Sequence, residues 1–239
     1  MPFPALGATS LAFPHGAPRP AIVMRSQWRA DETKRDPHAH YAQGVKAVFI
    51  HHTDSPNNYD CDDVPGTVRN LYTGQTRDRQ WGDLGYNFLV DKCGTIYEGR
   101  AGGTDRPVVG SHTLGFNQDT TGIAAIGTFD RGTPVPAPME RAIAALAAWK
   151  LGLSGIDPTS KVRLTSTSDK SRYPAGTSAA FNAISGHRDG YATSCPGEAL
   201  FARLPAIRSL AARLQGRPLP APAGATLPSD LPILQHVGH

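Results

Sequence analysis

Two adjacent histidines, His51 and His52, are the first residues in the chain whose types and position suggest chemistry. They directly follow residues 48–50, a short apolar run with β-branched and aromatic side chains, which predicts a buried strand. Because side chains alternate along a strand, only one of the two imidazoles can face a given site. One histidine is therefore a candidate ligand, and the other packs or hydrogen-bonds locally. The alternative is that both histidines simply end the strand.

A second candidate group lies far downstream in the motif GHRDGYATSCPG, where seven residues separate His187 from Cys195. Two imidazoles and a thiolate are a common zinc set, and three protein ligands leave a fourth position for water. The residues therefore predict one catalytic Zn²⁺ ion. The competing use of the same residues is a Cys/His dyad for thiol hydrolysis, which would leave the strand-end histidines unexplained.

Composition limits the class of protein that these residues can serve. The chain has 239 residues, of which 39% are hydrophobic and 18% charged, and this predicts a soluble globular protein with a substantial core. No apolar run approaches the ~18 residues of a membrane span. The N-terminus lacks the basic and apolar regions of an intact signal peptide. The net charge of +4 is not clustered, which disfavours a nucleic-acid partner and is compatible with a polyanionic surface such as a bacterial wall.

Hydrophobic periodicity predicts strands interleaved with three amphipathic helices. The helices are expected over residues 64–72, 138–152 and 200–214, the last kinked or split by Pro205, and the strands over 48–50, 86–90, 95–97, 122–129 and just before His187. This pattern predicts a single α/β domain with a central mixed β-sheet flanked by about three helices. The domain is expected over residues 25–215, after an extended arm (1–24) and before a Pro-rich tail (216–239), with a polar excursion at residues 157–180.

Four motifs, VFIHHT, WGDLGYNFLVDKCGTIYEGR, VVGSHTLGFN and SGHRDGYATSCPG, resemble those of the peptidoglycan recognition proteins and type 2 N-acetylmuramoyl-L-alanine amidases. The resemblance runs from about Arg25 to about Leu214 and is strongest to the secreted actinobacterial branch. It implies a zinc-dependent amidase that cleaves the bond between the lactyl group of N-acetylmuramic acid and L-alanine of the stem peptide. It also implies a peptidoglycan or muropeptide partner, and a secreted, cell-wall-associated protein that acts as a monomer.

The resemblance assigns roles at the reacting centre. It implies that His51, the first of the pair, ligates zinc together with His187 and Cys195, and that Tyr86 is the catalytic tyrosine. A phenol with an ordinary pKa of ~10 is a donor at neutral pH, which suits oxyanion stabilisation better than proton abstraction. Thr193 occupies a position where phage amidases carry lysine. Threonine cannot act as a cation, so we expect it to position water or substrate.

A substrate groove is also implied by the resemblance. The residues expected to line it are His112, Trp81, Arg100, Phe116 and Asn117, although a structural role remains an alternative for each. His112 lies in a glycine-rich loop, where a core role is less expected. Two other function classes stay open: a module of the same fold that binds peptidoglycan without cutting it, and an amidase that acts on another acyl amide. Binding-only members typically replace the cysteine ligand, so Cys195 argues against the first.

The chain has three cysteines, Cys61, Cys93 and Cys195. With Cys195 assigned to the metal, we expect a disulfide between Cys61, which opens a helix, and Cys93, which lies in a hairpin turn. An extracellular enzyme tolerates such a bridge.

Overall fold

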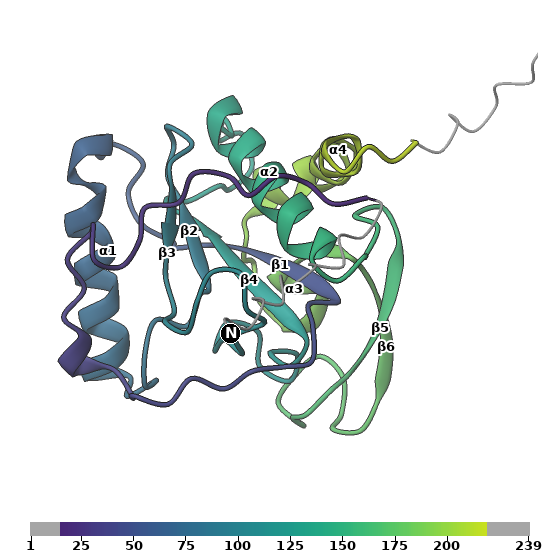
Figure 1. The fold of residues 1–239 in the computed structure, drawn as a ribbon, viewed down its shortest axis with the longest axis horizontal. Coiled ribbons are helices and arrows are strands. Elements are labelled where there is room, and N and C mark those ends of the chain that lie inside the picture. The colour runs from purple at the N-terminus through teal and green to yellow at the C-terminus, as the bar shows by residue number, and fades with distance from the viewer. Residues whose placement is uncertain (1–14, 219–239) are drawn as a thin grey trace, which may run out of the picture.

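Five strands form a mixed sheet at the centre of the domain: β1 Ala47–His52, β2 Phe88–Val90, β3 Ile96–Glu98, β4 Thr120–Ala125 and β7 Ile184–Gly186 (Figure 1). The computed structural model describes residues 15–218, so most of the predicted arm and tail lie outside the described residues. The order across the sheet is β3-β2-β4-β1-β7, and only β3 is antiparallel to its neighbour. All six residues of β1 are buried, as its apolar run requires of a central strand.

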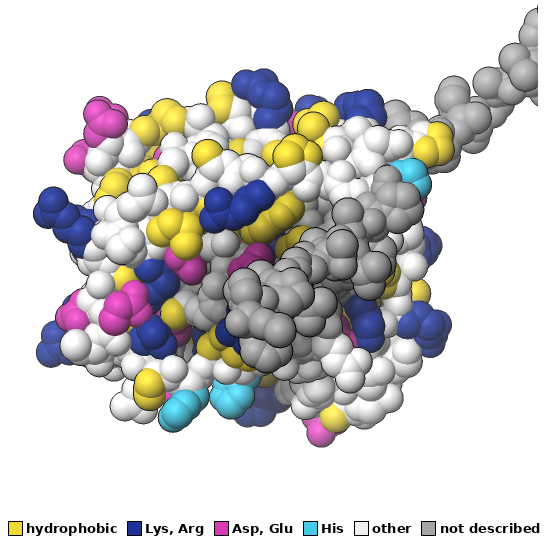
Figure 2. Space-filling view, in the orientation of Figure 1, with side chains coloured by type: hydrophobic (Ala, Val, Ile, Leu, Met, Phe, Trp, Pro, Cys, Tyr) yellow, Lys and Arg dark blue, Asp and Glu magenta, His cyan; other side chains and the backbone are white. Residues whose placement is uncertain are grey.

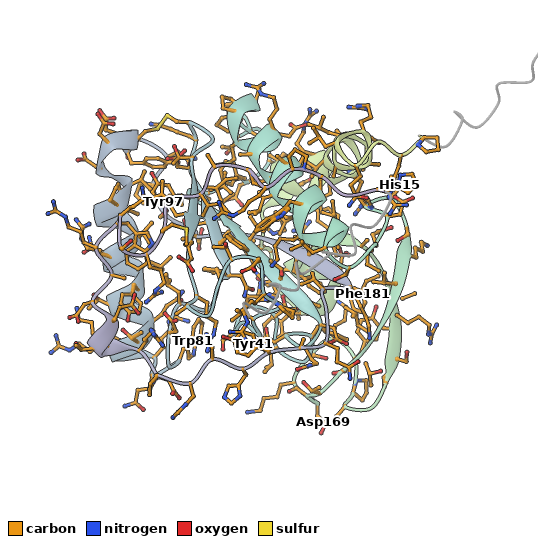
Figure 3. The ribbon with its side chains drawn as sticks, viewed as in Figure 1. His15, Tyr41, Trp81, Tyr97, Asp169 and Phe181 are labelled. Atoms are coloured by element: carbon orange, nitrogen blue, oxygen red, sulfur yellow. A yellow bond between two sulfur atoms is a disulfide. The ribbon has the colours of Figure 1, made fainter. Side chains whose placement is uncertain are left out.

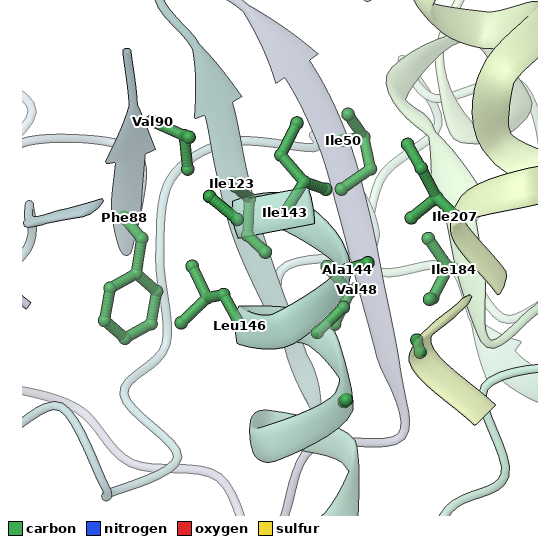
Figure 4. Packing of buried hydrophobic residues seen from close by; sticks show 14 of the residues in the cluster. Val48, Ile50, Phe88, Val90, Ile123, Ile143, Ala144, Leu146, Ile184 and Ile207 are labelled. Carbon is green, nitrogen blue, oxygen red and sulfur yellow. The ribbon is translucent and has the colours of Figure 1, made fainter. Parts of the chain in front are cut away.

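Two helices, α2 Ala137–Gly152 and α4 Glu198–Leu214, cover one face of the sheet (Figure 1). Figure 4 shows Ile143 and Leu146 of α2 packed against strand residues that include Val48 and Ile50 of β1. Burying each such aliphatic side chain contributes about 1.5–3 kcal/mol. Because Val48 and Ile50 face these helices, the alternation of side chains along β1 turns Phe49 and His51 to the opposite face.

The opposite face is covered by two separate elements. Helix α1, Val64–Thr73, packs Val68 and Tyr72 against β2, β3 and β4. A small antiparallel sheet of β5 Lys161–Thr165 and β6 Ser178–Asn182 packs through Phe181 against Phe49. The remaining α-helix is the single turn α3 His187–Gly190, and short helical turns occur at Glu32–Lys34, Cys61–Asp63 and Gly74–Asp78. The predicted single α/β domain with a mixed sheet is therefore confirmed, with three long helices and one short one.

One local prediction was wrong, and one of two alternatives is excluded at another position. Residues 157–180, expected to be a polar excursion, contribute β5 and the start of β6, whose alternate positions carry apolar residues such as Leu164 that pack on the domain. The outward residues are polar, and they masked this two-residue period. Of the two effects expected of Pro205, splitting is excluded: α4 continues across it, and Leu204 and Ile207 on either side are buried in the core.

The N-terminal segment docks against the edge of the sheet. Val23 pairs with Tyr97 as an isolated bridge beside β3. Trp28 is fully buried and donates its indole N–H to the Glu98 carbonyl at 2.7 Å. Arg25 forms a buried ion pair with Asp83 at 3.1 Å. This segment therefore braces the loop that leads from Asp83 into β2.

Cys61 and Cys93 form a disulfide that ties the start of the α1 region to the turn between β2 and β3. Among the described helices, none combines the length and the apolar character needed to cross a bilayer. On the face drawn in Figure 2, basic and acidic side chains are interspersed and no patch of a single sign dominates. This mixture agrees with the modest net charge of +4.

Candidate metal centre

Three potential ligands converge where β1 and β7 end. Because the two strands are adjacent and parallel, His51 at the end of β1 and His187 just after β7 lie at the same edge, with ring centroids 4.4 Å apart. Cys195 reaches them from the loop before α4. One ligand atom from each residue lies within 4.8 Å of the others. Gly197 makes this loop possible: its φ is +86°, and a Cβ there would lie 2.2 Å from the Phe129 carbonyl oxygen.

The donor set and its spacing fit a zinc ion. His51 Nδ1 lies 3.8 Å from Cys195 Sγ. Zinc bonds of about 2.1 Å to nitrogen and 2.3 Å to sulfur place two tetrahedral ligands about 3.6 Å apart. Three such ligands leave one coordination position for a reactant, which is the arrangement of catalytic rather than structural zinc sites.

Burial sets the protonation of these groups. It lowers the pKa of His187 to about 4 and that of His51 well below its ordinary value, so both imidazoles are neutral and offer lone pairs at pH 7. Burial raises the pKa of the Cys195 thiol to about 12. The backbone N–H of His52 donates to Cys195 Sγ at 3.3 Å and favours the thiolate only modestly. A thiolate at this depth therefore calls for a cation, and metal binding would release the thiol proton.

His52 does not join the converging group. Its imidazole offers no atom to the three-residue set of His51, His187 and Cys195. Its Nδ1 is buried and has no hydrogen-bond partner in the described part of the chain. The structure thus separates the two histidines as strand alternation predicts, and the candidate ligand is the first of the pair.

Tyr86 and Thr193 lie beside the converging residues. The Tyr86 ring centroid is 5.2 Å from that of His51, and burial raises the pKa of its phenol, which keeps the hydroxyl protonated. None of the side-chain hydrogen bonds among residues 15–218 involves this hydroxyl, so it is free to donate to a ligand. Thr193 Oγ1 accepts a hydrogen bond from the Cys195 backbone N–H at 3.2 Å, and this contact orders the loop that carries Cys195.

A groove of about 530 Å³ opens beside His187. Three of the predicted groove residues, Trp81, His112 and Asn117, line it. Trp81 is 37% exposed and lies at the lower edge of the domain in Figure 3, with the Arg79 guanidinium 5.1 Å from its ring. An aromatic wall with one cation suits a ligand that has both apolar groups and carboxylates.

Two other predicted groove residues lie elsewhere. Phe116 is 1% exposed and packs edge-on against Tyr173 and Phe181, so it is a core residue of the β5–β6 side. Arg100 is not in the lining of the groove: its guanidinium donates to the Leu84 carbonyl at 2.9 Å and lies 3.4 Å from Ser111 Oγ. Phe116 lies in the same loop as the lining residues Leu114 and Asn117, whereas the lining includes no residue from the segment around Arg100.

Four further residues line the groove and were not predicted from the sequence. Tyr191 stacks on His187, with centroids 5.5 Å apart and an interplanar angle of 18°. Leu114 is 43% exposed, and Ser111 and Arg79 complete the set. The signal for Tyr191 was its place inside the motif that carries His187 and Cys195. Nothing in the local pattern distinguished Arg79 from other surface arginines.

Comparisons with known proteins agree with this geometry. The family model described as N-acetylmuramoyl-L-alanine amidase matches residues 41–198. The human N-acetylmuramoyl-L-alanine amidase is 31% identical over 202 residues, which cover 83% of this chain and 30% of that protein. The chain spans about a third of the length of several curated relatives that it matches.

Solved structures show the same fold. Drosophila PGRP-LB is 28% identical with a TM-score of 0.60, covering 77% of this chain and 92% of that one. Peptidoglycan recognition protein-LE, solved in complex with tracheal cytotoxin (monomeric diaminopimelic acid-type peptidoglycan), is 27% identical with a TM-score of 0.61, covering 78% and 93%. Peptidoglycan recognition proteins are therefore among the solved structures to which this chain is similar. Because the family model spans well over half of the chain, the protein belongs to the N-acetylmuramoyl-L-alanine amidase family.

Proposed function

We propose that the protein is a zinc-dependent N-acetylmuramoyl-L-alanine amidase that hydrolyses the lactyl–L-alanine amide of peptidoglycan. The observation that carries the proposal is the convergence of His51, His187 and Cys195 within 4.8 Å at the side of the groove. Tyr86 lies next to this set, and its hydroxyl takes part in no side-chain hydrogen bond within residues 15–218. Binding-only members typically replace the cysteine ligand, so Cys195 favours an enzyme over a binding module.

The chain's own residues perform three tasks in this reaction. His51, His187 and Cys195 would hold a zinc ion, which supplies Lewis-acid activation of water and of the scissile carbonyl. The protonated Tyr86 hydroxyl donates a hydrogen bond to the oxygen on which negative charge develops. Trp81 and Tyr191 offer aromatic surfaces to the substrate, and Arg79 offers a positive charge to the carboxylates of the stem peptide.

The setting of the enzyme follows from the same proposal. The complex of peptidoglycan recognition protein-LE with a muropeptide supports a muropeptide as the ligand of this groove. The Cys61–Cys93 disulfide supports a secreted protein, because such bonds persist in oxidising compartments. We propose that the protein acts on the cell wall outside the cell, as a monomer.

The test is the product analysis of a defined muropeptide incubated with the purified protein. We expect release of the free stem peptide and of the sugar that keeps its lactyl group, identified by mass spectrometry. Chelation should stop the reaction and zinc should restore it. Binding of the muropeptide without cleavage would support the recognition module instead. Cleavage of other acyl amides, with the muropeptide left intact, would support the third class.

The two adjacent histidines provide a matched pair of variants. His51→Ala removes one converging ligand atom and should lose both bound zinc and amidase activity. His52→Ala removes an imidazole outside the set but keeps the backbone N–H that donates to Cys195, so it should retain zinc. Zinc is measured by elemental analysis of the purified variants. If only His52→Ala lost the metal, the assignment of the pair would be reversed.

A further inference from the structure

The two ring nitrogens of His51 face different partners. Nδ1 is directed at Cys195 Sγ, 3.8 Å away. Nε2 lies 3.2 Å from His112 Nδ1 and 3.4 Å from Thr113 Oγ1. We propose that His112 is a positioning residue that fixes the orientation of His51 by accepting a hydrogen bond from its Nε2–H. The inference rests on the proposed zinc function, and it assigns His112 a task other than substrate contact.

The hydrogen-bond partners of His112 determine which of its two ring nitrogens carries the proton. Thr120 Oγ1 donates to the Phe116 carbonyl at 2.6 Å, which commits its only proton. At 3.4 Å from His112 Nε2, the same oxygen can therefore only accept, so the His112 proton belongs on Nε2. His112 Nδ1 is then left with a lone pair, which has two neighbours: His51 Nε2 at 3.2 Å and Thr113 Oγ1 at 3.0 Å.

Metal binding by His51 requires a tautomer that is complementary to that of His112. A histidine that binds a metal through Nδ1 must carry its proton on Nε2. That proton lies within hydrogen-bond reach of the His112 Nδ1 lone pair, with the two nitrogens 3.2 Å apart. Thr113 Oγ1 lies between the two rings, 3.0 Å from His112 Nδ1 and 3.4 Å from His51 Nε2, so its hydroxyl can donate to the same lone pair and accept from the same proton. The two rings meet at an interplanar angle of 77° with centroids 5.2 Å apart. The hydrogen bond and the metal geometry therefore require the same arrangement of protons.

The surrounding chain is built to hold the His112 ring in place. His112 is 6% exposed. On β4, a Cβ at Gly122 would lie 2.4 Å from His112 Cγ, so only glycine leaves room for the ring. Asn117 Oδ1 accepts from the backbone N–H of both His112 and Thr113, at 2.9 and 2.8 Å, which fixes the loop. Asn117 lines the groove, yet its side-chain oxygen is committed to positioning His112.

The partner of His51 is a neutral imidazole, and this affects the net charge of the metal centre. Outer partners of metal-bound histidines are usually carboxylates or carbonyl groups, and a carboxylate would add a negative charge beside the Cys195 thiolate. His112 orients His51 without that charge. The centre formed by one thiolate and two neutral imidazoles with Zn²⁺ therefore keeps a net positive charge, which favours activation of a carbonyl.

The test compares two substitutions by zinc affinity, without any substrate. His112→Asn places an amide oxygen near the position of Nδ1 and keeps an acceptor, whereas His112→Phe fills the space without one. We expect His112→Phe to lower zinc affinity 10–100-fold, the usual cost of losing such a partner, and His112→Asn to lose much less. Affinity is measured by competition with a zinc-binding dye, and the melting temperatures of the metal-free variants check their folding.

A measurement on the wild-type protein keeps the inference testable if the phenylalanine variant misfolds. In the zinc-loaded, ¹⁵N-labelled protein, we expect a through-hydrogen-bond nitrogen–nitrogen coupling between His51 Nε2 and His112 Nδ1. A proton found on His112 Nδ1 would overturn the inference. So would a well-folded His112→Phe protein with unchanged zinc affinity and a raised KM for muropeptide, because His112 would then contact substrate only. Failure of the wild-type protein to bind zinc would instead overturn the proposed function.

Discussion

At the scale of single residues, candidate metal ligands were easier to identify from the sequence than the side chains that pack against one another. The types and positions of His51, His187 and Cys195 pointed to zinc because strand ends and a tight loop present side chains to a common edge. The choice of His51 over His52 came from the family resemblance, and the structure shows the strand alternation on which it depends. Phe116 was misplaced because its burial depends on Phe181, a distant partner that no local pattern reveals.

The role of Tyr86 can be separated from a purely structural one by removing its hydroxyl. Because this hydroxyl holds no internal partner among the described residues, Tyr86→Phe should keep its zinc and its melting temperature. Turnover of muropeptide should fall on the order of 10²-fold, the typical cost of losing one preorganised donor. A rate assay and a thermal melt measure both quantities.

Tyr97 is the matched control for that variant. Its buried hydroxyl lies 3.1 Å from Asp91 Oδ2, to which it donates. Tyr97 lies on β3, which β2 and β4 separate from β1 and its His51. Tyr97→Phe should therefore destabilise the protein by about 1–3 kcal/mol and leave kcat almost unchanged. If Tyr86→Phe behaved like Tyr97→Phe, the catalytic assignment would be wrong.

At the scale of elements, hydrophobic periodicity predicted the long helices, whose apolar side chains pack in the core. Helices α1 and α4 follow the apolar spacing of the sequence, because each buries one stripe of its surface. Helix α2 is buried around most of its circumference, and its apolar residues pack against both the sheet and α4. The β5–β6 pair escaped prediction because its strands are short and half exposed. Its connecting loop also supports the site: Thr167 donates its backbone N–H to Gly115, and Arg172 to Gly190, at 2.9 and 3.0 Å.

Lys150 on α2 links this helix to the loop before the groove. It is 1% exposed, and its Nζ donates to the carbonyls of Thr104 and Arg106 at 2.8 and 3.0 Å. Burial lowers the pKa of the ammonium to about 8, against an ordinary value of 10.5, and the charge of Asp105 opposes this only in part. The folded protein therefore releases this proton at a lower pH than the unfolded chain does.

The sign of the resulting pH dependence follows from proton counting. Between pH 8 and pH 10.5 the unfolded chain binds more protons at Lys150 than the folded protein, so the free energy of unfolding rises with pH. The free energy of unfolding of the wild-type protein, relative to that of Lys150→Met, should therefore rise by up to about 3 kcal/mol over this window. Below pH 8 the difference between the two proteins should be constant. Denaturant unfolding of both proteins at a series of pH values measures the difference. If the difference in free energy of unfolding between the two proteins stayed flat or fell as the pH rose, the buried ammonium would remain charged over this window.

At the scale of the whole molecule, the site is assembled from segments that lie far apart in the chain. The ligands come from residues 51, 187 and 195, and Tyr86 follows a loop braced by the N-terminal segment through Arg25 and Asp83. That segment precedes residue 41, where the family model begins. The sequence could predict the parts and their order, but only the folded chain shows that Asn117 and His112 lie between the groove and the metal ligands.

Because the ligands converge only when the chain is folded, zinc should stabilise the whole domain. An ion that binds the folded state alone at 100 times its Kd adds about 2.7 kcal/mol to the free energy of unfolding. For a chain of this size, that corresponds to a rise of about 5–10 °C in melting temperature. His51→Ala and Cys195→Ser should abolish the rise, and His52→Ala should preserve it. The rise should also grow with pH, since binding must displace the proton of a thiol whose pKa is about 12. Calorimetry of the four proteins with and without zinc measures these shifts, and an undiminished rise in Cys195→Ser would place the metal elsewhere in the molecule.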